Sequence, residues 1–296
     1  MRNHFSGSFR PTDLQKWAGP FPDWSRISKR GTVFRSLPYI LWPFIWLLLG
    51  ACAPGPDPAP YSGTKGAVSD RDTGEFHLFA PCTQVELDRW EAAAQEDEVS
   101  ALKAADCHAF LARHGTDRGS RLAHAEKGRK LAELAVSMLP ESARAHYLLA
   151  CLTGLEAENN PLQGLELVPV IEREALAAAD LNPGLDHGGP DRMLGELYLR
   201  APAFPISIGD SAKSLAHFRR ALAQAPDFNE NRLGLVEALL AGEKRVEACQ
   251  ELKRLLRRMG SETETPPLWP RALELLEQLC AGLKGQPAGS NIDQDL

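Results

Sequence analysis

The most regular feature of this chain is a series of apolar helical patterns, each closed by the same alanine-to-proline spacing. The spacing occurs at Ala135–Pro140, Ala178–Pro183 and Ala221–Pro226, and successive prolines are 43 residues apart. Proline cannot continue a helix, and a new apolar pattern follows each one. The constant period therefore predicts stacked helical hairpins; the alternative is an ordinary bundle with accidental spacing.

The stretch 187–240 carries this pattern in most detail and resembles the helix pair of a tetratricopeptide repeat (TPR). Leu194 and Tyr198 lie four residues apart and therefore share one helix face. Gly195 is expected to allow close approach of a partner helix, and Ala221 is small where two helices are expected to cross. A ten-residue loop, 201–210, replaces the usual tight turn between the two helices.

Apolar positions at helical spacing predict further helices on both sides of this stretch. Two of them, between residues 76 and 115, are expected to cap the stack. Asn160–Pro161 is typical of a helix start, and Asp210 is expected to cap another helix. No stretch alternates at strand spacing, so the predicted fold is all-α, with stacked helical hairpins in a TPR-like solenoid or bundle. The other helices are expected over 117–139, 141–155, 161–179, 211–225, 229–241, 246–259 and 269–283.

The N-terminal region has a different pattern, typical of an export signal. Residues 1–51 hold seven basic and two acidic side chains, and they lead into the apolar segment 37–50. Fourteen residues with two prolines are too few for a membrane-spanning helix, which needs about 20. The sequence Leu49-Gly-Ala-Cys52 resembles a bacterial lipobox, in which the cysteine becomes the acylated first residue. A buried cysteine after a core helix is the alternative, and the basic arm is long for a signal peptide.

These features predict four regions: a removed signal segment (1–51), a Pro/Gly-rich tether (52–75), a TPR-like helical domain (76–284) and a disordered tail (285–296). The total net charge is −6, so the chain after residue 51 carries −11. This acidic body argues against nucleic-acid binding. Ala53 follows the lipobox cysteine, and by resemblance to enteric lipoproteins this favours the outer membrane over the inner membrane.

An exported protein can form disulfides, and the six cysteines divide accordingly. Cys82–Cys107 and Cys249–Cys280 are the proposed pairs, although sequence alone does not establish connectivity. Cys151 is interpreted as a buried apolar residue. No pair has metal-ligand spacing, so no metal site is predicted.

No catalytic constellation is evident, so neither an enzyme nor a cofactor is predicted. Asp186-His187-Gly-Gly can be interpreted as a polar site, but a flexible turn between repeats explains it better. His108 and His114 are expected to be solvated on a polar face. An enzyme would need clustered histidines or carboxylates in a pocket.

The loop 201–210 is the main candidate for binding. Phe204, Ile206 and Ile208 are spaced at two, so an extended segment would point them in one direction. They would then either fill the repeat core or line a groove for a ligand or partner. Together with Arg192 and Tyr198 they form the hypothetical binding set.

Four motifs in residues 120–260 resemble the TatT family of periplasmic lipoproteins. This resemblance implies an all-helical repeat fold and a link to tripartite ATP-independent periplasmic (TRAP) transport. It also implies pairing with a periplasmic solute-binding protein and transfer of small apolar or organic-acid ligands. The motifs are Asn160-Pro-Leu-Gln-Gly164, Gly188-Gly189-Pro190-x-Arg192-x-Leu194-Gly195, Ala201-Pro-x-x-Pro205-x-Ser207-x-Gly209-Asp210 and Pro226-x-x-x-Glu230-Asn231.

The sequence-based expectation is therefore a TPR-like accessory of a TRAP system, held in the periplasm by a lipid on Cys52. The alternative is an outer-membrane lipoprotein that acts as a scaffold for envelope assembly through protein contacts. Homo-oligomerisation is left open by both interpretations.

Overall fold

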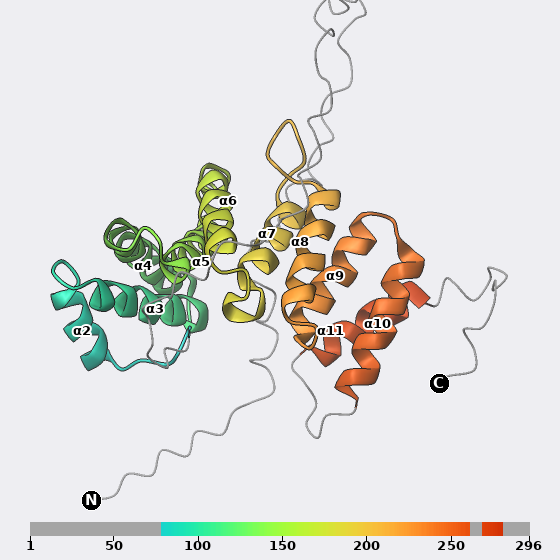
Figure 1. Ribbon diagram of the computed structural model, residues 1–296, viewed down its shortest axis with the longest axis horizontal. Coiled ribbons are helices and arrows are strands. Elements are labelled where there is room, and N and C mark those ends of the chain that lie inside the picture. The colour runs from blue at the N-terminus through green and yellow to red at the C-terminus, as the bar shows by residue number, and fades with distance from the viewer. Residues whose placement is uncertain (1–77, 261–267, 281–296) are drawn as a thin grey trace, which may run out of the picture. The chain divides into compact units, whose positions relative to one another are not determined.

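The computed structural model describes residues 78–260 and 268–280, and ten α-helices account for most of them (Figure 1). The predicted all-α class is confirmed: the only strand-like pairing among the described residues is one bridge between Ala203 and Gly209. The helices are α2 (Gln84–Ala93), α3 (Glu98–His114), α4 (Arg118–Met138), α5 (Ala143–Asn159), α6 (Gly164–Leu181), α7 (Gly189–Arg200), α8 (Ser211–Gln224), α9 (Asn229–Ala241), α10 (Arg245–Met259) and α11 (Trp269–Cys280), with a short 3-10 turn η2 (Leu185–His187) between α6 and α7.

The repeated alanine-to-proline spacing marks equivalent helix ends. Helices α4, α6 and α8 each end two residues before the proline of their repeat. The three alanines are fully buried, and each accepts a hydrogen bond from the N–H that closes its helix, at 2.8, 2.9 and 3.1 Å in chain order. The period therefore repeats a specific structural unit.

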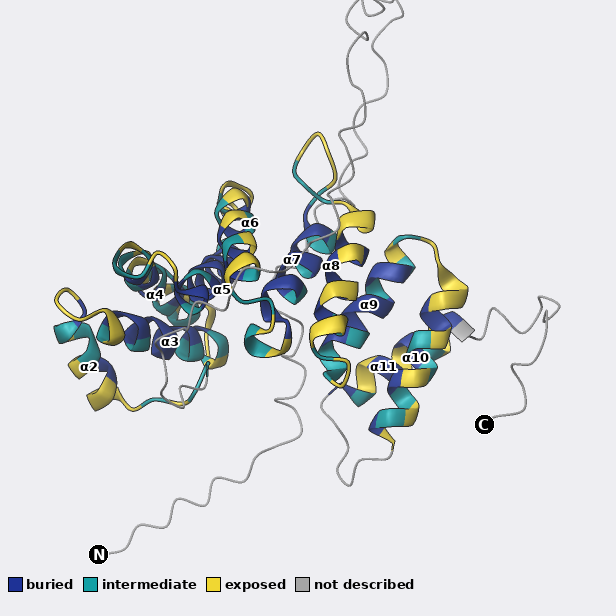
Figure 2. Ribbon diagram, in the orientation of Figure 1, coloured by how far each residue is buried: buried dark blue, intermediate teal, exposed yellow. Residues whose placement is uncertain are grey.

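Successive helices pack against each other along the chain from α2 to α11, as stacked hairpins require. Contacts also join α3 to α5 and α7 to α9, so the first helices of these two pairs of neighbouring hairpins touch directly. Helix α5 is buried along nearly its whole length, as the dark blue ribbon in Figure 2 shows. Burial on all sides is expected for a helix that packs against α3, α4 and α6 together.

Several of these helices begin with a side-chain cap, whereas α6, α9 and α10 begin without one. Asp210 caps α8 as expected, since its carboxylate accepts the N–H groups of Ala212 and Lys213 at 2.8 and 3.0 Å. The expected helix start at Asn160–Pro161 is wrong. The Asn160 N–H instead bonds to the Glu156 carbonyl and closes α5, so that α6 begins only after a turn, at Gly164.

Several expectations concern parts of the chain outside the described residues. The signal segment, the lipobox cysteine Cys52, the tether and the tail all lie there. Among the described helices, none combines the length and the apolar character that crossing a bilayer demands.

Candidate functional site

The loop 201–210 does not form the extended strand that its spacing suggested. Hydrogen bonds from the Gly209 N–H to the Pro202 carbonyl and from the Asp210 N–H to the Tyr198 carbonyl, both 2.9 Å, fix its two ends. The Ile206 N–H bonds to the Ala203 carbonyl at 3.1 Å and turns the chain at the tip. The loop is therefore a compact, closed turn.

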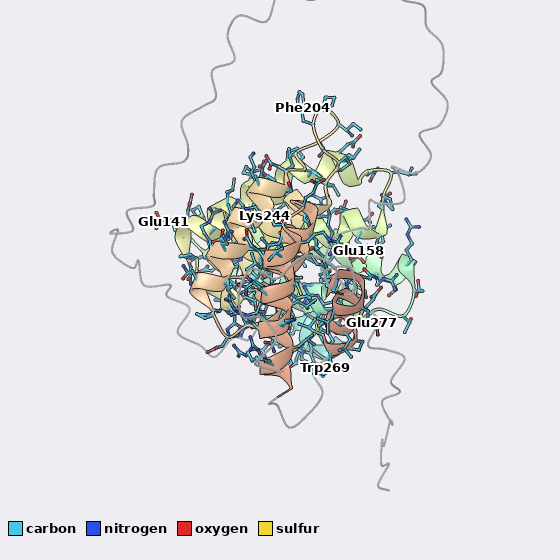
Figure 3. All side chains as sticks on the ribbon, turned by 90° about the vertical axis from the view of Figure 1, so that its right-hand side faces the viewer. Glu141, Glu158, Phe204, Lys244, Trp269 and Glu277 are labelled. Carbon is cyan, nitrogen blue, oxygen red and sulfur yellow. A yellow bond between two sulfur atoms is a disulfide. The ribbon has the colours of Figure 1, made fainter. Side chains whose placement is uncertain are left out.

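This turn separates the three apolar side chains that were expected to point the same way. Phe204 is 88% exposed and Ile206 70% exposed, whereas Ile208 is half-buried against the core cluster formed by α5, α6 and α7. Figure 3 shows Phe204 at the outermost part of the loop. The expectation of three aligned side chains is wrong, because a tight turn reverses the chain between Phe204 and Ile208. Ile208 contributes to the core, and Phe204 and Ile206 form an apolar tip.

The Arg192 side chain does not face an open binding surface. It lies between helices and takes part in contacts that connect four elements. Its Nη2 donates to Asp186 Oδ2 at 2.6 Å and its Nη1 to Asn231 Oδ1 at 3.0 Å. The Tyr147 hydroxyl donates to the same Asp186 oxygen at 2.7 Å, and the guanidinium lies 4.8 Å from the Phe228 ring. These contacts connect α5, η2, α7 and α9, and they occupy the donors through which Arg192 would hold a ligand.

Charged side chains continue along the same face of α7, at intervals of four residues. Arg200 Nε donates to Glu196 at 2.6 Å, and Arg200 Nη2 to Glu237 of α9 at 3.1 Å. Arg271 of α11 reaches the other oxygen of Glu237 at 3.1 Å. Desolvation raises the pKa of Glu196, although Arg200 beside it favours the ionised form. The alternating charges neutralise each other and hold α7, α9 and α11 together.

Tyr198 also lies inside the molecule, at the junction of α6, α7 and α8. Its hydroxyl donates to Glu172, and its ring stacks on His217 at a centroid distance of 5.2 Å. His217 Nδ1 lies 2.8 Å from Asp191 Oδ1, and Arg220 donates to that oxygen at 2.9 Å. Sequence reasoning missed this cluster, although His217 and Arg220, three residues apart on α8, were a visible signal.

A buried histidine beside a carboxylate could in principle serve as a general base. Burial lowers the pKa of His217, and Arg220 adds to this effect, so the neutral ring is favoured. Tyr198 nevertheless stacks on the His217 ring, and only 9% of the His217 side chain is exposed to solvent. The cluster is therefore best explained as packing between α7 and α8.

The glycine-rich motif before α7 is structural. Gly188 has φ of 80°, and a Cβ at this position would lie 2.9 Å from the Ala221 carbonyl oxygen. Gly189 packs against the Tyr147 hydroxyl, and Pro190 occupies the first turn of α7. At the loop, a Cβ on Gly209 would lie 2.0 Å from the Ala201 carbonyl oxygen. The motif thus brings the end of η2 against α8, which agrees with a turn between repeats, whereas Gly209 closes the neck of the loop.

The cysteines follow the expected division as far as the structure describes them. Cys82 and Cys107 form a disulfide with a Cα–Cα distance of 5.7 Å. Cys151 is buried and not disulfide-bonded, and burial raises the pKa of its thiol to about 12. Cys249 is disulfide-bonded; because the side chain of Cys280 is outside the described residues, their pairing remains a prediction.

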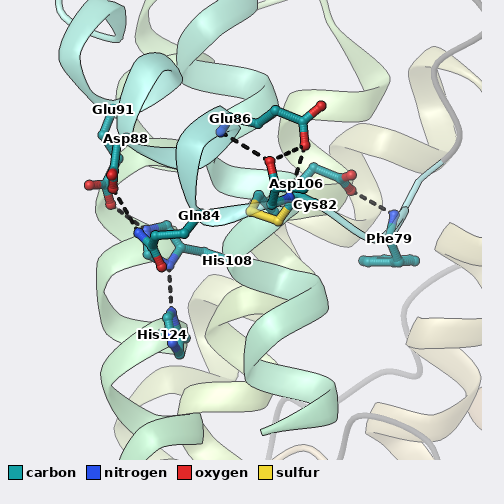
Figure 4. The surroundings of a disulfide bond; sticks show 11 residues. Phe79, Cys82, Gln84, Glu86, Asp88, Glu91, Asp106, His108 and His124 are labelled. Atoms are coloured by element: carbon teal, nitrogen blue, oxygen red, sulfur yellow. Dashed lines mark hydrogen bonds and ion pairs between the residues drawn. A yellow bond between two sulfur atoms is a disulfide. The ribbon is translucent and has the colours of Figure 1, made fainter. Parts of the chain in front are cut away.

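The expectation that His108 is solvated is wrong, whereas His114 is exposed. His108 is fully buried: its Nε2 lies 2.7 Å from Glu91 Oε1 and its Nδ1 lies 2.9 Å from His124 Nδ1 (Figure 4). Only two histidines meet here, and within the described ranges no group of three or more His, Cys, Asp or Glu residues could hold a metal ion.

The comparisons with known proteins add no relative to this picture: no protein-family model matches the chain, and no curated protein matches it. The resemblance to TatT therefore remains a hypothesis based on the motifs.

Proposed function

We propose that this protein is a lipid-anchored periplasmic accessory of a TRAP-type transport system that captures a solute-binding protein with the tip of its loop 201–210. The observation that carries the proposal is the exposure of Phe204 and Ile206, at 88% and 70%, on a loop with hydrogen-bonded ends. Burying large apolar side chains on binding is favourable, and a fixed loop loses little freedom when it binds. Such a tip is therefore typical of a protein contact site.

A third exposed apolar residue, in another turn, supports a contact surface at this end of the hairpins. Leu162 is 95% exposed in the turn between α5 and α6, which corresponds in the preceding hairpin to the loop between α7 and α8. The transport assignment is supported separately by the TatT-like motifs, and the anchor by the lipobox.

The test is capture of the candidate solute-binding protein by wild type and by Phe204→Ala. Truncating an aromatic anchor of an interface typically costs about 2 kcal/mol or more, so capture should weaken by roughly thirtyfold or more. The melting temperature should stay unchanged because the side chain is exposed. Val85→Ala, which alters a 79% exposed apolar residue on α2, is the matched control and should capture normally.

An outer-membrane scaffold for envelope assembly would use the same exposed tip, and the captured protein distinguishes the two functions. Recovery of an envelope-assembly protein instead of a solute-binding protein would favour the scaffold. Equal capture by wild type and Phe204→Ala would exclude the loop tip as the contact site in either case.

A further inference from the structure

The short segment Leu78–Cys82 lies against α3 and α5 although it belongs to no helix. Leu78 and Phe79 both pack against the two hydrophobic clusters that meet at α5. Figure 4 shows Phe79 beside Asp106 of α3. The segment thus occupies a surface formed by the helices, much as a separate peptide would.

The ring of Phe79 is held by groups that recognise any aromatic ring. The guanidinium of Arg113 on α3 lies over it, 4.2 Å from its centroid. The Tyr147 ring on α5 meets it edge to face at 6.3 Å. These helices together provide a slot for an aromatic side chain.

The main chain of the segment is recognised by a buried carboxylate. The Phe79 N–H donates to Asp106 Oδ1 at 2.7 Å, and Asp106 is only 3% exposed. Burial raises the pKa of Asp106 to about 6, although the Phe79 and Ala80 N–H groups, Arg144 of α5 and Arg113 of α3 all favour the ionised form. A carboxylate that accepts peptide N–H groups selects main chain rather than a particular sequence.

The segment is held by these contacts and not by local preference. Phe79 has φ of 61°, a left-handed conformation that is unfavourable for a bulky aromatic residue. The disulfide from Cys82 to Cys107, the residue after Asp106, keeps the segment beside the slot at high effective concentration.

We propose that Leu78–Cys82 occupies, in cis, a binding site for a peptide with an aromatic side chain, and that a peptide of a partner protein binds there when this segment is displaced. The site is formed by Asp106, Arg113 and Tyr147. It is distinct from the loop 201–210, so the two proposals stand or fall independently.

The first experiment measures binding of a labelled synthetic peptide with the sequence of residues 77–82, its cysteine replaced by serine. The purified double variant Phe79→Ala/Cys82→Ser lacks both the ring and the covalent tether of the cis segment. It should bind the peptide at least tenfold more tightly than wild type does. A peptide with alanine in place of its phenylalanine is the matched probe and should not bind, and adding Arg113→Ala to the variant should weaken binding.

A folded double variant that binds the peptide no better than wild type would overturn the proposal. If the variant fails to fold, amide hydrogen exchange of the wild-type protein tests the proposal instead. The Phe79 and Ala80 amides should exchange at least tenfold faster than the slowest amides of α3, because the segment must open without global unfolding. Exchange of these amides only on global unfolding would show that the segment is a fixed part of the core.

Discussion

His146 shows how one side chain can make the contact between two helices depend on pH. Its Nδ1 lies 2.6 Å from Glu174 of α6, and its Nε2 lies 3.0 Å from the Pro140 carbonyl oxygen. A neutral imidazole can donate to only one of these acceptors, whereas the imidazolium donates to both. The hydrogen bond to Glu174 accordingly raises the pKa of His146. Desolvation opposes ionisation of Glu174, but its bonds to His146 and Arg173 outweigh it and lower its pKa.

We expect the coupling between His146 and Glu174 to be stronger at pH 5.5 than at pH 8.5. The raised pKa of His146 contributes stability below its unfolded value, near 6.5, that disappears as pH rises through the folded pKa. The lowered pKa of Glu174 keeps its carboxylate ionised at pH 5.5. A double-mutant cycle with His146→Gln and Glu174→Gln should give roughly 0.5–3 kcal/mol at pH 5.5 by denaturant unfolding. An equal coupling energy at pH 8.5 would contradict this assignment.

At the level of helices, one aromatic side chain organises the contacts of α7, α8 and α9. Phe218 of α8 is fully buried, with its ring between Gly195 of α7 and Gly234 of α9. A Cβ at Gly195 would lie 2.8 Å from the ring, and one at Gly234 only 2.0 Å from it. The Ser214 hydroxyl also donates to the Gly195 carbonyl at 2.8 Å. Gly195 therefore does allow the close approach of α8 expected of it, and the ring of Phe218 fills the space.

Gly195→Ala and Gly234→Ala should both destabilise the protein, and Gly234→Ala more strongly. Overpacking a filled core typically costs about 1–3 kcal/mol, which exceeds the gain of up to about 1 kcal/mol from replacing glycine in a helix. Gly119→Ala is the control: Gly119 is exposed near the start of α4, where its Cβ would meet only Asp117 Oδ1 at 3.3 Å. Thermal unfolding would show lower melting temperatures for the first two variants and no loss for the third. Unchanged stability of Gly234→Ala would mean that Phe218 repacks easily.

At the scale of the whole molecule, the described helices form a series of hairpins. The proposed function also requires that this helical domain be anchored to a membrane in the periplasm. Helices α4, α6 and α8 each end two residues before a proline and are closed by the same hydrogen bond to a buried alanine. The loop tip and the cis-occupied peptide site belong to different parts of this stack. If both proposals hold, the protein offers two contact sites on one anchored body.

Cys52→Ala should release the protein from the membrane into the soluble periplasmic fraction. The lipobox cysteine is the expected site of acylation, and one or more acyl chains supply the membrane affinity. Cell fractionation with mass spectrometry of the N-terminus checks the result. A variant that remains in the membrane fraction with an intact N-terminus would exclude the lipoprotein interpretation.

Local patterns in the sequence were sufficient to predict the helices, most of their ends and the 43-residue period. Caps, prolines and apolar spacing act within a few residues, so the chain carries this information without reference to its fold. The failure at Asn160 has the same origin: an asparagine can begin a helix or end one, and the bond to Glu156 decided between them.

Tertiary structure alone decided the features that depend on partners distant in sequence. His108 is buried because Glu91 and His124 reach it from α2 and α4, and Arg192 is occupied because Asp186 and Asn231 converge on it. The Phe79 N–H donates to Asp106, which lies 27 residues further along the sequence. Helical periodicity shows which face of a helix is buried, but not which neighbour covers it or which side chain the neighbour supplies.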